Sequence, residues 1–309
     1  KKEIMSAILA ENIFKTYGKR KEIKALADVS FDVQQGELFG IIGSDGAGKT
    51  SLFRILTTLL LADSGKASVE GLDVVKDYKA IRKTVGYMPG RFSLYPDLTV
   101  EENLNFFATV FSTTVRQNYD LIKDIYGQIE PFKKRKAGEL SGGMKQKLAL
   151  SCALIHRPTV LFLDEPTTGV DAVSRKEFWE MLKNLKMLGI TILVSTPYMD
   201  EAGLCDKIAL IQNGKILSIN TPRGIVHKFQ KSLFAVRSSH MLILLNTLKE
   251  FYEVDDVYPF GQYHHVVMKK GSSEEKLHSF LTQKMKNDFE LKAATPGIED
   301  CFIDLMKEN

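Results

Sequence analysis

The chain has 309 residues, a length that fits about two domains, and its composition of 44% hydrophobic and 26% charged residues is ordinary for a globular protein. The net charge is only +4, with no long basic block, so charge does not support nucleic-acid binding. No apolar run approaches the roughly 18 residues of a membrane span, so we expect any work at a membrane to depend on a partner. Cys152, Cys205 and Cys301 lie far apart and form no CxxC pair, and we expect them to be reduced and buried.

Short apolar runs and helical patterns alternate in the first two thirds of the chain. The runs "ELFGII" (37–42), "TVLFLDE" (159–165) and "TILVST" (191–196) are rich in Val, Ile, Leu and Phe. Such runs, separated by helices, are typical of parallel strands covered on both faces. At 207–220, two β-like runs flank Asn213-Gly214, which predicts a hairpin.

The sequence changes character around residues 221–224, and a polar connection follows. Four strand-like runs then alternate with two helical patterns in the order β-α-β-β-α-β, which predicts a ferredoxin-like fold. The strands are expected at 233–239, 253–258, 264–270 and 289–295, and the helices at 240–252 and 272–286. "SSEEK", from Ser272, has Ser followed three residues later by an acid, a helix-start pattern. Residues 295–309 are expected to form a short amphipathic helix.

The segment "GSDGAGKT" (43–50) lies between a strand and a helical pattern and matches GxxxxGK[ST] in its required context. Its glycines let the backbone turn its N–H groups inward to form an anion site with the helix N-terminus. Lys49 adds a charge for the β- and γ-phosphates, and the Thr50 hydroxyl can bind Mg²⁺. A chance glycine-rich turn is the alternative interpretation. We predict a nucleoside-triphosphate site formed by Gly43, Ser44, Asp45, Gly46, Ala47, Gly48, Lys49, Thr50 and Ser51.

Two carboxylates end the apolar run at 161–165. An exposed acidic strand end is one interpretation. With a phosphate loop in the same chain, the better one places Asp164 in the Mg²⁺ shell and makes Glu165 the general base that polarises an attacking water. Strand alternation separates the two side chains, so they can take different roles. Glu165 and Lys49 are therefore the predicted catalytic residues.

From Leu140 the chain reads "LSGGMKQKLALSCALIHRP", and an "LDEP" strand follows. In this order and spacing, the sequence resembles the ABC-type ATPases from residue 8 to about residue 222. The resemblance implies ATP and Mg²⁺ as cofactors. Tyr17 in "KTYG" matches the aromatic residue that stacks on adenine, although an ordinary core or turn tyrosine also fits. Asp171 in "TTGVDAVSR" matches the D-loop aspartate.

The signature segment has its own physical logic. Ser141, Gly142 and Gly143 precede a helix-forming run, and small residues at a helix N-terminus form a second anion site. Gln146 also stands at its expected place, which argues against a mere helix cap. In the family, the signature closes over the γ-phosphate bound to the other protomer. The resemblance therefore implies a head-to-tail pair, either a homodimer or two paired ATPase halves, with two ATP molecules between them.

Residues 91–111 resemble the start of the helical subdomain, which in transporters of this family receives a short helix of the membrane subunit. Phe92, Leu94 and Tyr95 are candidates for an apolar docking surface, with buried packing as the equal alternative. The sequence and its small C-terminal extension most resemble ATPase subunits of ABC-2-type exporters. That likeness implies an integral membrane permease subunit as partner and a peripheral location at the cytoplasmic face of the inner membrane, without nucleic acid.

Two residues expected from the family are absent. After "GYMP" the family has Gln, which touches Mg²⁺ and the lytic water, and this chain has Gly90. After the strand 191–196 the family has a His that contacts the γ-phosphate, and this chain has Pro197. Both are also normal turn or strand-exit residues. We expect their loss to slow hydrolysis more than it weakens ATP binding.

Together these patterns predict an α/β P-loop NTPase: a RecA-like core with ABC antiparallel β and helical subdomains, and a small α+β domain after it. The expected boundaries are an N-terminal extension (1–7), an ABC ATPase domain (8–222) with its helical subdomain at about 92–150, a linker (223–231) and an accessory domain (232–309). The predicted function is the ATP-hydrolysing subunit of an exporter. The alternatives are a hydrolysis-impaired subunit that completes a partner's site and, with less support, a soluble ABC protein that acts on ribosomes or DNA.

Overall fold

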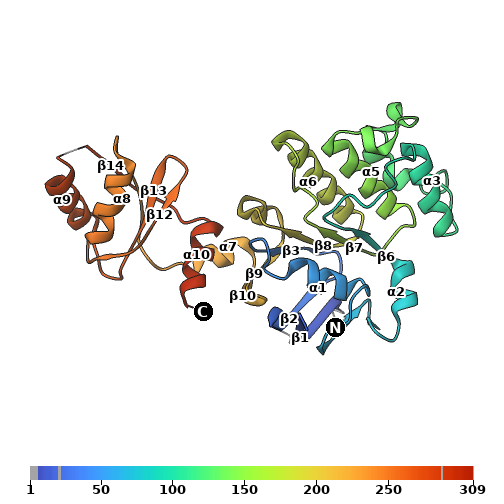
Figure 1. Ribbon diagram of the computed structural model, residues 1–309, viewed down its shortest axis with the longest axis horizontal. Coiled ribbons are helices and arrows are strands. Elements are labelled where there is room, and N and C mark those ends of the chain that lie inside the picture. The colour runs from blue at the N-terminus through green and yellow to red at the C-terminus, as the bar shows by residue number, and fades with distance from the viewer. Residues whose placement is uncertain (1–5, 20–21, 287, 309) are drawn as a thin grey trace. The chain divides into compact units, whose positions relative to one another are not determined.

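The computed structural model describes residues 6–19, 22–286 and 288–308 (Figure 1). Its contacts divide the chain into two compact units: unit 2 is Gly224–Asp304, and unit 1 holds the chain before it together with the residues from Leu305 onward. Residues 1–5 of the expected N-terminal extension lie outside the described residues. Ser6 already begins the first strand, two residues before the expected start of the ATPase domain at residue 8.

Unit 1 is built on a mixed sheet whose strand order is β10-β9-β3-β8-β7-β6. Its neighbours pair in parallel, except in the β9–β10 hairpin, where Asn213 and Gly214 form the predicted turn with positive φ. All residues of β3, β7 and β8 are buried, which explains their continuous apolar sequence. The strands are Leu38–Ile42 (β3), Val85–Met88 (β6), Val160–Asp164 (β7), Thr191–Thr196 (β8), Lys207–Gln212 (β9) and Lys215–Asn220 (β10).

A second sheet in unit 1 is antiparallel, with the order β2-β1-β4-β5. Its strands are Ser6–Tyr17 (β1), Ile23–Gln34 (β2), Ser64–Val69 (β4) and Leu72–Asp73 (β5). Figure 1 shows this sheet and α1 (Lys49–Leu56) on one side of the mixed sheet, and α5 (Gly142–Leu154) and α6 (Ala172–Met187) on the other. The core on the α1 side is apolar: Phe53 meets Phe162 edge-on with ring centroids 6.2 Å apart.

Helices occupy most of the chain between β6 and β7. They are α3 (Val100–Val110), α4 (Tyr119–Tyr126), two short 3-10 turns (Glu130–Phe132 and Ala137–Glu139) and α5, whereas α2 (Tyr78–Thr84) precedes β6. The start of α3 is fixed by a capping box: the Thr99 hydroxyl accepts from the Glu102 N–H, and the Glu102 carboxylate accepts from the Thr99 N–H. After β8 the chain forms the 3-10 helix η3 (Met199–Leu204) and, after β10, α7 (Pro222–His227).

Unit 2 follows the order β11-α8-β12-β13-α9-β14, and its antiparallel sheet has the order β12-β13-β11-β14. The elements are Leu233–Arg237 (β11), Met241–Glu250 (α8), Val254–Phe260 (β12), Tyr263–Met268 (β13), Glu274–Met285 (α9) and Glu290–Ala293 (β14), followed by α10 (Ile298–Glu308). The two helices bury Leu244, Leu248, Leu277 and Leu281 against the sheet, so the unit has its own core. Helix α9 starts where the Ser–acid pattern predicts, although Ser273 at its N-cap makes no side-chain capping bond.

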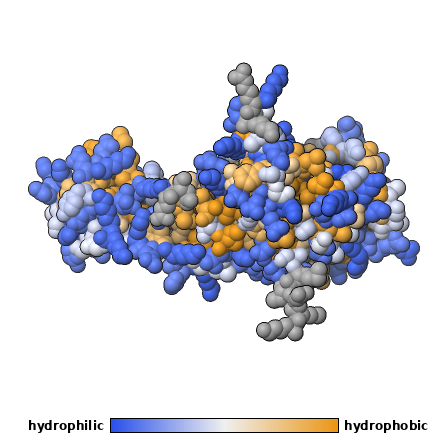
Figure 2. Space-filling view, turned by 90° about the horizontal axis from the view of Figure 1, so that it is seen from below, coloured by the Kyte–Doolittle hydropathy of each residue, from blue (hydrophilic) through white to orange (hydrophobic). Residues whose placement is uncertain are grey.

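Hydrophobic residues gather in patches among hydrophilic ones on the face drawn in Figure 2. No helix in residues 6–19, 22–286 and 288–308 is long and apolar enough to cross a membrane. Cys152, Cys205 and Cys301 are buried free thiols, as predicted, and burial raises the pKa of the Cys152 thiol.

Candidate ATP site

The phosphate loop leaves β3 and enters α1, and its glycines are required by geometry. Gly46 and Gly48 have φ of 78° and 105°, in the left-handed region that glycine tolerates. Neither end of the loop has room for a side chain. A Cβ at Gly43 would lie 2.1 Å from the carbonyl oxygen of Ile211, and a Cβ at Gly48 would lie 2.2 Å from that of Ala25. Because α1 begins at Lys49, the free N–H groups of its first turn are available to an anion.

Lys49 is 2% exposed and its ammonium lies between the loop and the end of β7. Its Nζ donates to the carbonyl oxygens of Gly43 at 2.8 Å and Ser44 at 2.9 Å, and lies 3.1 Å from Oε1 of Glu165. The structure therefore brings the two predicted catalytic residues into contact, although they come from distant segments.

Ser195, on β8, forms hydrogen bonds with both acidic residues at the end of β7. Its hydroxyl donates to Oδ1 of Asp164 at 2.7 Å and accepts from the N–H of Glu165 at 2.9 Å. Asp164 is 1% exposed, and Glu165 adopts a φ of 51°, in the left-handed region. Sequence reasoning missed Ser195, because one hydroxyl in an apolar strand gives no signal until the strand register is known.

The donor set at Thr50 and Asp164 suits Mg²⁺, which prefers hard oxygen ligands and takes only one or two from protein, with phosphates and waters supplying the others. A larger cluster of three or more His, Cys, Asp or Glu side chains is absent from the part of the chain that the structure describes. Burial, helped by the nearby charge of Asp164, raises the pKa of Tyr87 to about 12, so this phenol stays protonated.

Tyr17 ends β1 beside the phosphate-loop helix. Its hydroxyl lies 3.1 Å from Oγ of Ser51, and the Nζ of Lys15 lies 5.8 Å from its ring centroid. Its side chain is 37% exposed, so it is not a core tyrosine. Within the loop itself, the Ser44 hydroxyl donates to Oε1 of Gln212 at 2.6 Å.

The signature segment begins α5, and its start lies against the start of α6. Ser141 caps α5 by accepting from the N–H of Met144, and both Ser141 and Gly142 are exposed. A Cβ at Gly143 would lie 2.8 Å from Oγ of Ser174. Asp171 is the N-cap of α6 and accepts from the N–H groups of Val173 and Ser174 at 3.1 and 3.0 Å. Asp171 thus stabilises the start of α6, independently of any contact with a partner.

The positions that lack the expected Gln and His both border this site. A Cβ at Gly90 would lie 2.9 Å from the carbonyl oxygen of Asp164 and 3.6 Å from Cβ of Glu165. Gly90 lines a cavity of about 150 Å³ together with Glu165 and Gln146. Pro197 is half-buried directly after β8, and the following N–H, of Tyr198, donates to the Thr196 hydroxyl at 3.1 Å.

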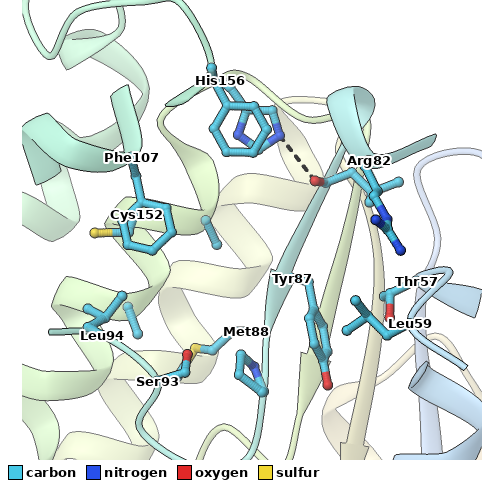
Figure 3. Close-up of a pocket in the computed structure, with 15 residues that line it drawn as sticks. Thr57, Leu59, Arg82, Tyr87, Met88, Ser93, Leu94, Phe107, Cys152 and His156 are labelled. Atoms are coloured by element: carbon cyan, nitrogen blue, oxygen red, sulfur yellow. Dashed lines mark hydrogen bonds between the residues drawn. The ribbon is translucent and has the colours of Figure 1, made fainter. Parts of the chain in front are cut away.

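A separate apolar cavity of about 260 Å³ lies between β6, α3 and α5 (Figure 3). Leu94, 7% exposed, lines it, whereas Phe92 and Tyr95 are 39% and 47% exposed. The ring of Phe111 stacks on His156, with centroids 3.7 Å apart, and Nε2 of His156 lies 3.1 Å from the carbonyl oxygen of Val85. Burial lowers the pKa of His156, so the neutral imidazole is favoured.

The family described as ABC transporter matches residues 26–168. The chain is 38% identical over 287 residues to the probable multidrug ABC transporter ATP-binding protein YbhF of Escherichia coli, covering 91% of this chain and 49% of YbhF. It is 37% identical over 225 residues to the doxorubicin resistance ATP-binding protein DrrA of Mycobacterium tuberculosis, covering 72% of this chain and 68% of DrrA. The dimeric bacterial ABC transporter cassette MJ0796 superposes with a TM-score of 0.63 at 25% identity, covering 69% of this chain and 98% of the cassette.

The fold and the motif order define an ABC-type P-loop ATPase. The chain belongs to the ATP-binding proteins of ABC transporters, and is related to YbhF and DrrA. It spans about half the length of YbhF, with 49% of that protein covered.

Proposed function

We propose that this chain binds and hydrolyses ATP as the nucleotide-binding subunit of an exporter, and that it drives a separate membrane subunit. The observation that carries the proposal is the contact between Lys49 and Glu165 at 3.1 Å, beside the phosphate loop. Lys49 and the loop N–H groups hold the phosphates, Thr50 and Asp164 hold Mg²⁺, and Glu165 accepts a proton from the attacking water. Bound Mg²⁺ would supply charge neutralisation on the phosphate oxygens.

The exposed start of α5 supports a head-to-tail pair. Ser141 and Gly142 present a helix N-terminus to solvent, and the phosphate loop of the same chain already forms its own anion site. A second chain or ATPase half that offers its bound γ-phosphate to this helix start would use both anion sites of each protomer. MJ0796, which shares the fold, forms a dimer, in line with this arrangement.

The apolar cavity of Figure 3 is the proposed docking site for the membrane subunit, at the cytoplasmic face of the inner membrane. Its open rim includes Leu59, 56% exposed, and it lies beside Phe92 and Tyr95, whose exposure favours docking over the buried alternative. Leu94 instead packs within its own chain and forms part of the cavity wall. The words multidrug transporter and doxorubicin resistance in the names of YbhF and DrrA suggest a small-molecule cargo.

Unit 2 is a ferredoxin-like accessory domain in this proposal. Its β-α-β-β-α-β order, with the sheet order β12-β13-β11-β14, supports that interpretation, as does its own hydrophobic core. The division between Arg223 and Gly224 falls within the expected linker (223–231), which supports the proposed domain boundary.

A hydrolysis-impaired subunit is the second candidate, favoured by Gly90 and Pro197. Neither residue offers a polar side chain to the γ-phosphate or the water. The length of YbhF, about twice the matched part, leaves room for pairing with a second ATPase half that has an intact site.

Steady-state phosphate release from the purified chain tests the proposal, with Glu165→Gln as the blank. We expect Mg²⁺-dependent release above that blank, together with binding of Mg-ATP. Binding without release would favour the hydrolysis-impaired subunit. A chain that neither bound ATP nor released phosphate would exclude both candidates.

A further inference from the structure

Glu201 is a buried carboxylate in η3, the turn that follows Pro197, and it is 2% exposed. Its Oε2 accepts from the hydroxyls of Thr167 at 3.0 Å and Thr196 at 2.5 Å, and its Oε1 accepts from Nε of Arg175 at 3.1 Å. Charge-assisted bonds of this kind in a buried place are strong and set geometry closely. None of the roles assigned above uses this residue.

The three donors to Glu201 come from three segments that surround the site. Thr167 lies in the loop between Glu165 and Asp171. Thr196 ends β8, and its carbonyl oxygen accepts from the N–H of Gly43, at the start of the phosphate loop, at 3.3 Å. Arg175 lies on α6, and its own N–H donates to the carbonyl oxygen of Asp171 at 2.9 Å. One carboxylate therefore ties the base-bearing loop, the phosphate loop and the start of α6 to each other.

We propose that Glu201 is a positioning residue for ATP hydrolysis: it holds the loop at 165–171 in register with the phosphate loop. The inference rests on the proposed ATPase function. Gly90 and Pro197 supply no polar side chain that could hold these segments, whereas the buried Glu201 carboxylate bonds to a donor on each of them. Its loss should displace Glu165 and Asp171 while Lys49 and the loop glycines still bind phosphate.

Arg175 provides a matched control, because it pairs with two neighbouring acids in different environments. Its Nη2 lies 3.1 Å from Oδ2 of Asp200, whose side chain is 74% exposed, whereas Glu201 is buried. Asp200→Asn removes a charge from the same arginine without touching Thr167 or Thr196. Glu201→Gln keeps the size of the side chain but replaces one of its two acceptor oxygens with an NH₂ group, which donates.

The first measurement compares phosphate release and ATP affinity in the parent, Glu201→Gln and Asp200→Asn, each corrected for its folded fraction. We expect Glu201→Gln to lower kcat by about ten- to a hundredfold, since a displacement of about 1 Å costs about 10²-fold in rate, with KM for ATP within about threefold of the parent. In Asp200→Asn, kcat should stay within about twofold of the parent value. Thr167→Val removes a single donor and should lower kcat by a smaller factor. This variant replaces Glu201→Gln in the test if Glu201→Gln does not fold.

Hydrogen exchange on the same proteins tests the positioning directly and needs no hydrolysis. Amides at 167–171 should exchange at least about tenfold faster in Glu201→Gln than in the parent, and at the parent rate in Asp200→Asn. Unchanged exchange there, or a kcat that falls only as far as the folded fraction does, would overturn the role of Glu201. A parent that neither binds nor hydrolyses ATP would remove the proposed function, while the exchange rates would still decide whether Glu201 holds the loop.

Discussion

Lys49 and Glu165 form an ion pair, with Nζ of Lys49 3.1 Å from Oε1 of Glu165 and the lysine almost wholly buried. The same ammonium donates to the carbonyl oxygens of Gly43 and Ser44, so its three protons all have partners. A phosphate that enters the loop must compete with Glu165 for this ammonium. Phosphate binding at Lys49 would therefore free Glu165 to face a water, which would couple binding to activation of the proposed base.

Replacing Lys49 by Ala should weaken Mg-ATP binding by roughly a hundredfold or more, because a buried charge-assisted contact to phosphate is lost and no other loop side chain is a cation. Isothermal titration calorimetry with Mg-ATP measures the change. Lys66→Ala, at an exposed position on β4, is the control and should bind as the parent does. An unchanged affinity in Lys49→Ala would contradict the assignment of the loop.

Glu165→Gln should give an ATP-stabilised dimer with at least the ATP affinity of the parent. The substitution removes the proton acceptor and also the carboxylate that competes for Lys49, while both anion sites remain. Gel filtration with excess Mg-ATP measures the dimer, and Glu11→Gln, exposed on β1, is the control. A purely monomeric Glu165→Gln at saturating nucleotide would count against the head-to-tail pair.

The parts of the site that could be predicted from the sequence are local in the chain. The phosphate loop follows from eight consecutive residues, and the strands before it and at 160–164 follow from uninterrupted apolar runs that a buried parallel strand requires. The contacts of Ser195 and Glu201 are different, because their partners lie 30 or more residues away or on another element. Ser195 meets Asp164 only because β7 and β8 pair in the register Asp164↔Ser195.

Helix starts show the same limit. The Ser–acid pattern at 272–275 predicts a helix start, and α9 does begin there, at Glu274, although Ser273 makes no capping bond; Thr99 and Glu102 form a complete capping box that was not predicted. A capping pattern needs its first residue at the true helix boundary, and the sequence locates a boundary only to within a few residues.

The stability of unit 1 should fall as the pH drops below about 6.5 because of His156. Its pKa in the folded chain lies below the ordinary value, owing mainly to burial, so the unfolded chain binds this proton more readily. The contribution is present above the unfolded pKa and is lost as pH falls toward the folded one. Urea midpoints at pH 7.5 and 5.5 measure it. In His156→Gln the difference between the two midpoints should shrink, and in the exposed His278→Gln it should match the parent.

Placing Gln at position 90 and His at position 197 should raise the hydrolysis rate, but the local structure accommodates the two substitutions unequally. Pro197 is half-buried at the exit of β8, and an imidazole there could donate to the γ-phosphate as charge develops in the transition state. A well-placed donor is worth about 10²–10³ in rate, and we expect Pro197→His alone to gain only about threefold, since the proline-set backbone does not aim the new ring.

Position 90 carries a steric obstacle that the sequence did not reveal. A Cβ at Gly90 would lie 2.9 Å from the carbonyl oxygen of Asp164, so Gly90→Gln must move the backbone at the predicted Mg²⁺ ligand before its amide can help. We expect Gly90→Gln alone to gain little or to lose activity, and the double variant to exceed the product of the singles, because the amide and the imidazole orient the same water and phosphate. Gly90→Ala adds the crowding without the amide and is the control. Phosphate release is read against Glu165→Gln. Equal rates for the parent and the double variant, both well above that blank, would mean that other residues already hold the γ-phosphate and the water, and that Gly90 and Pro197 are no loss to the site.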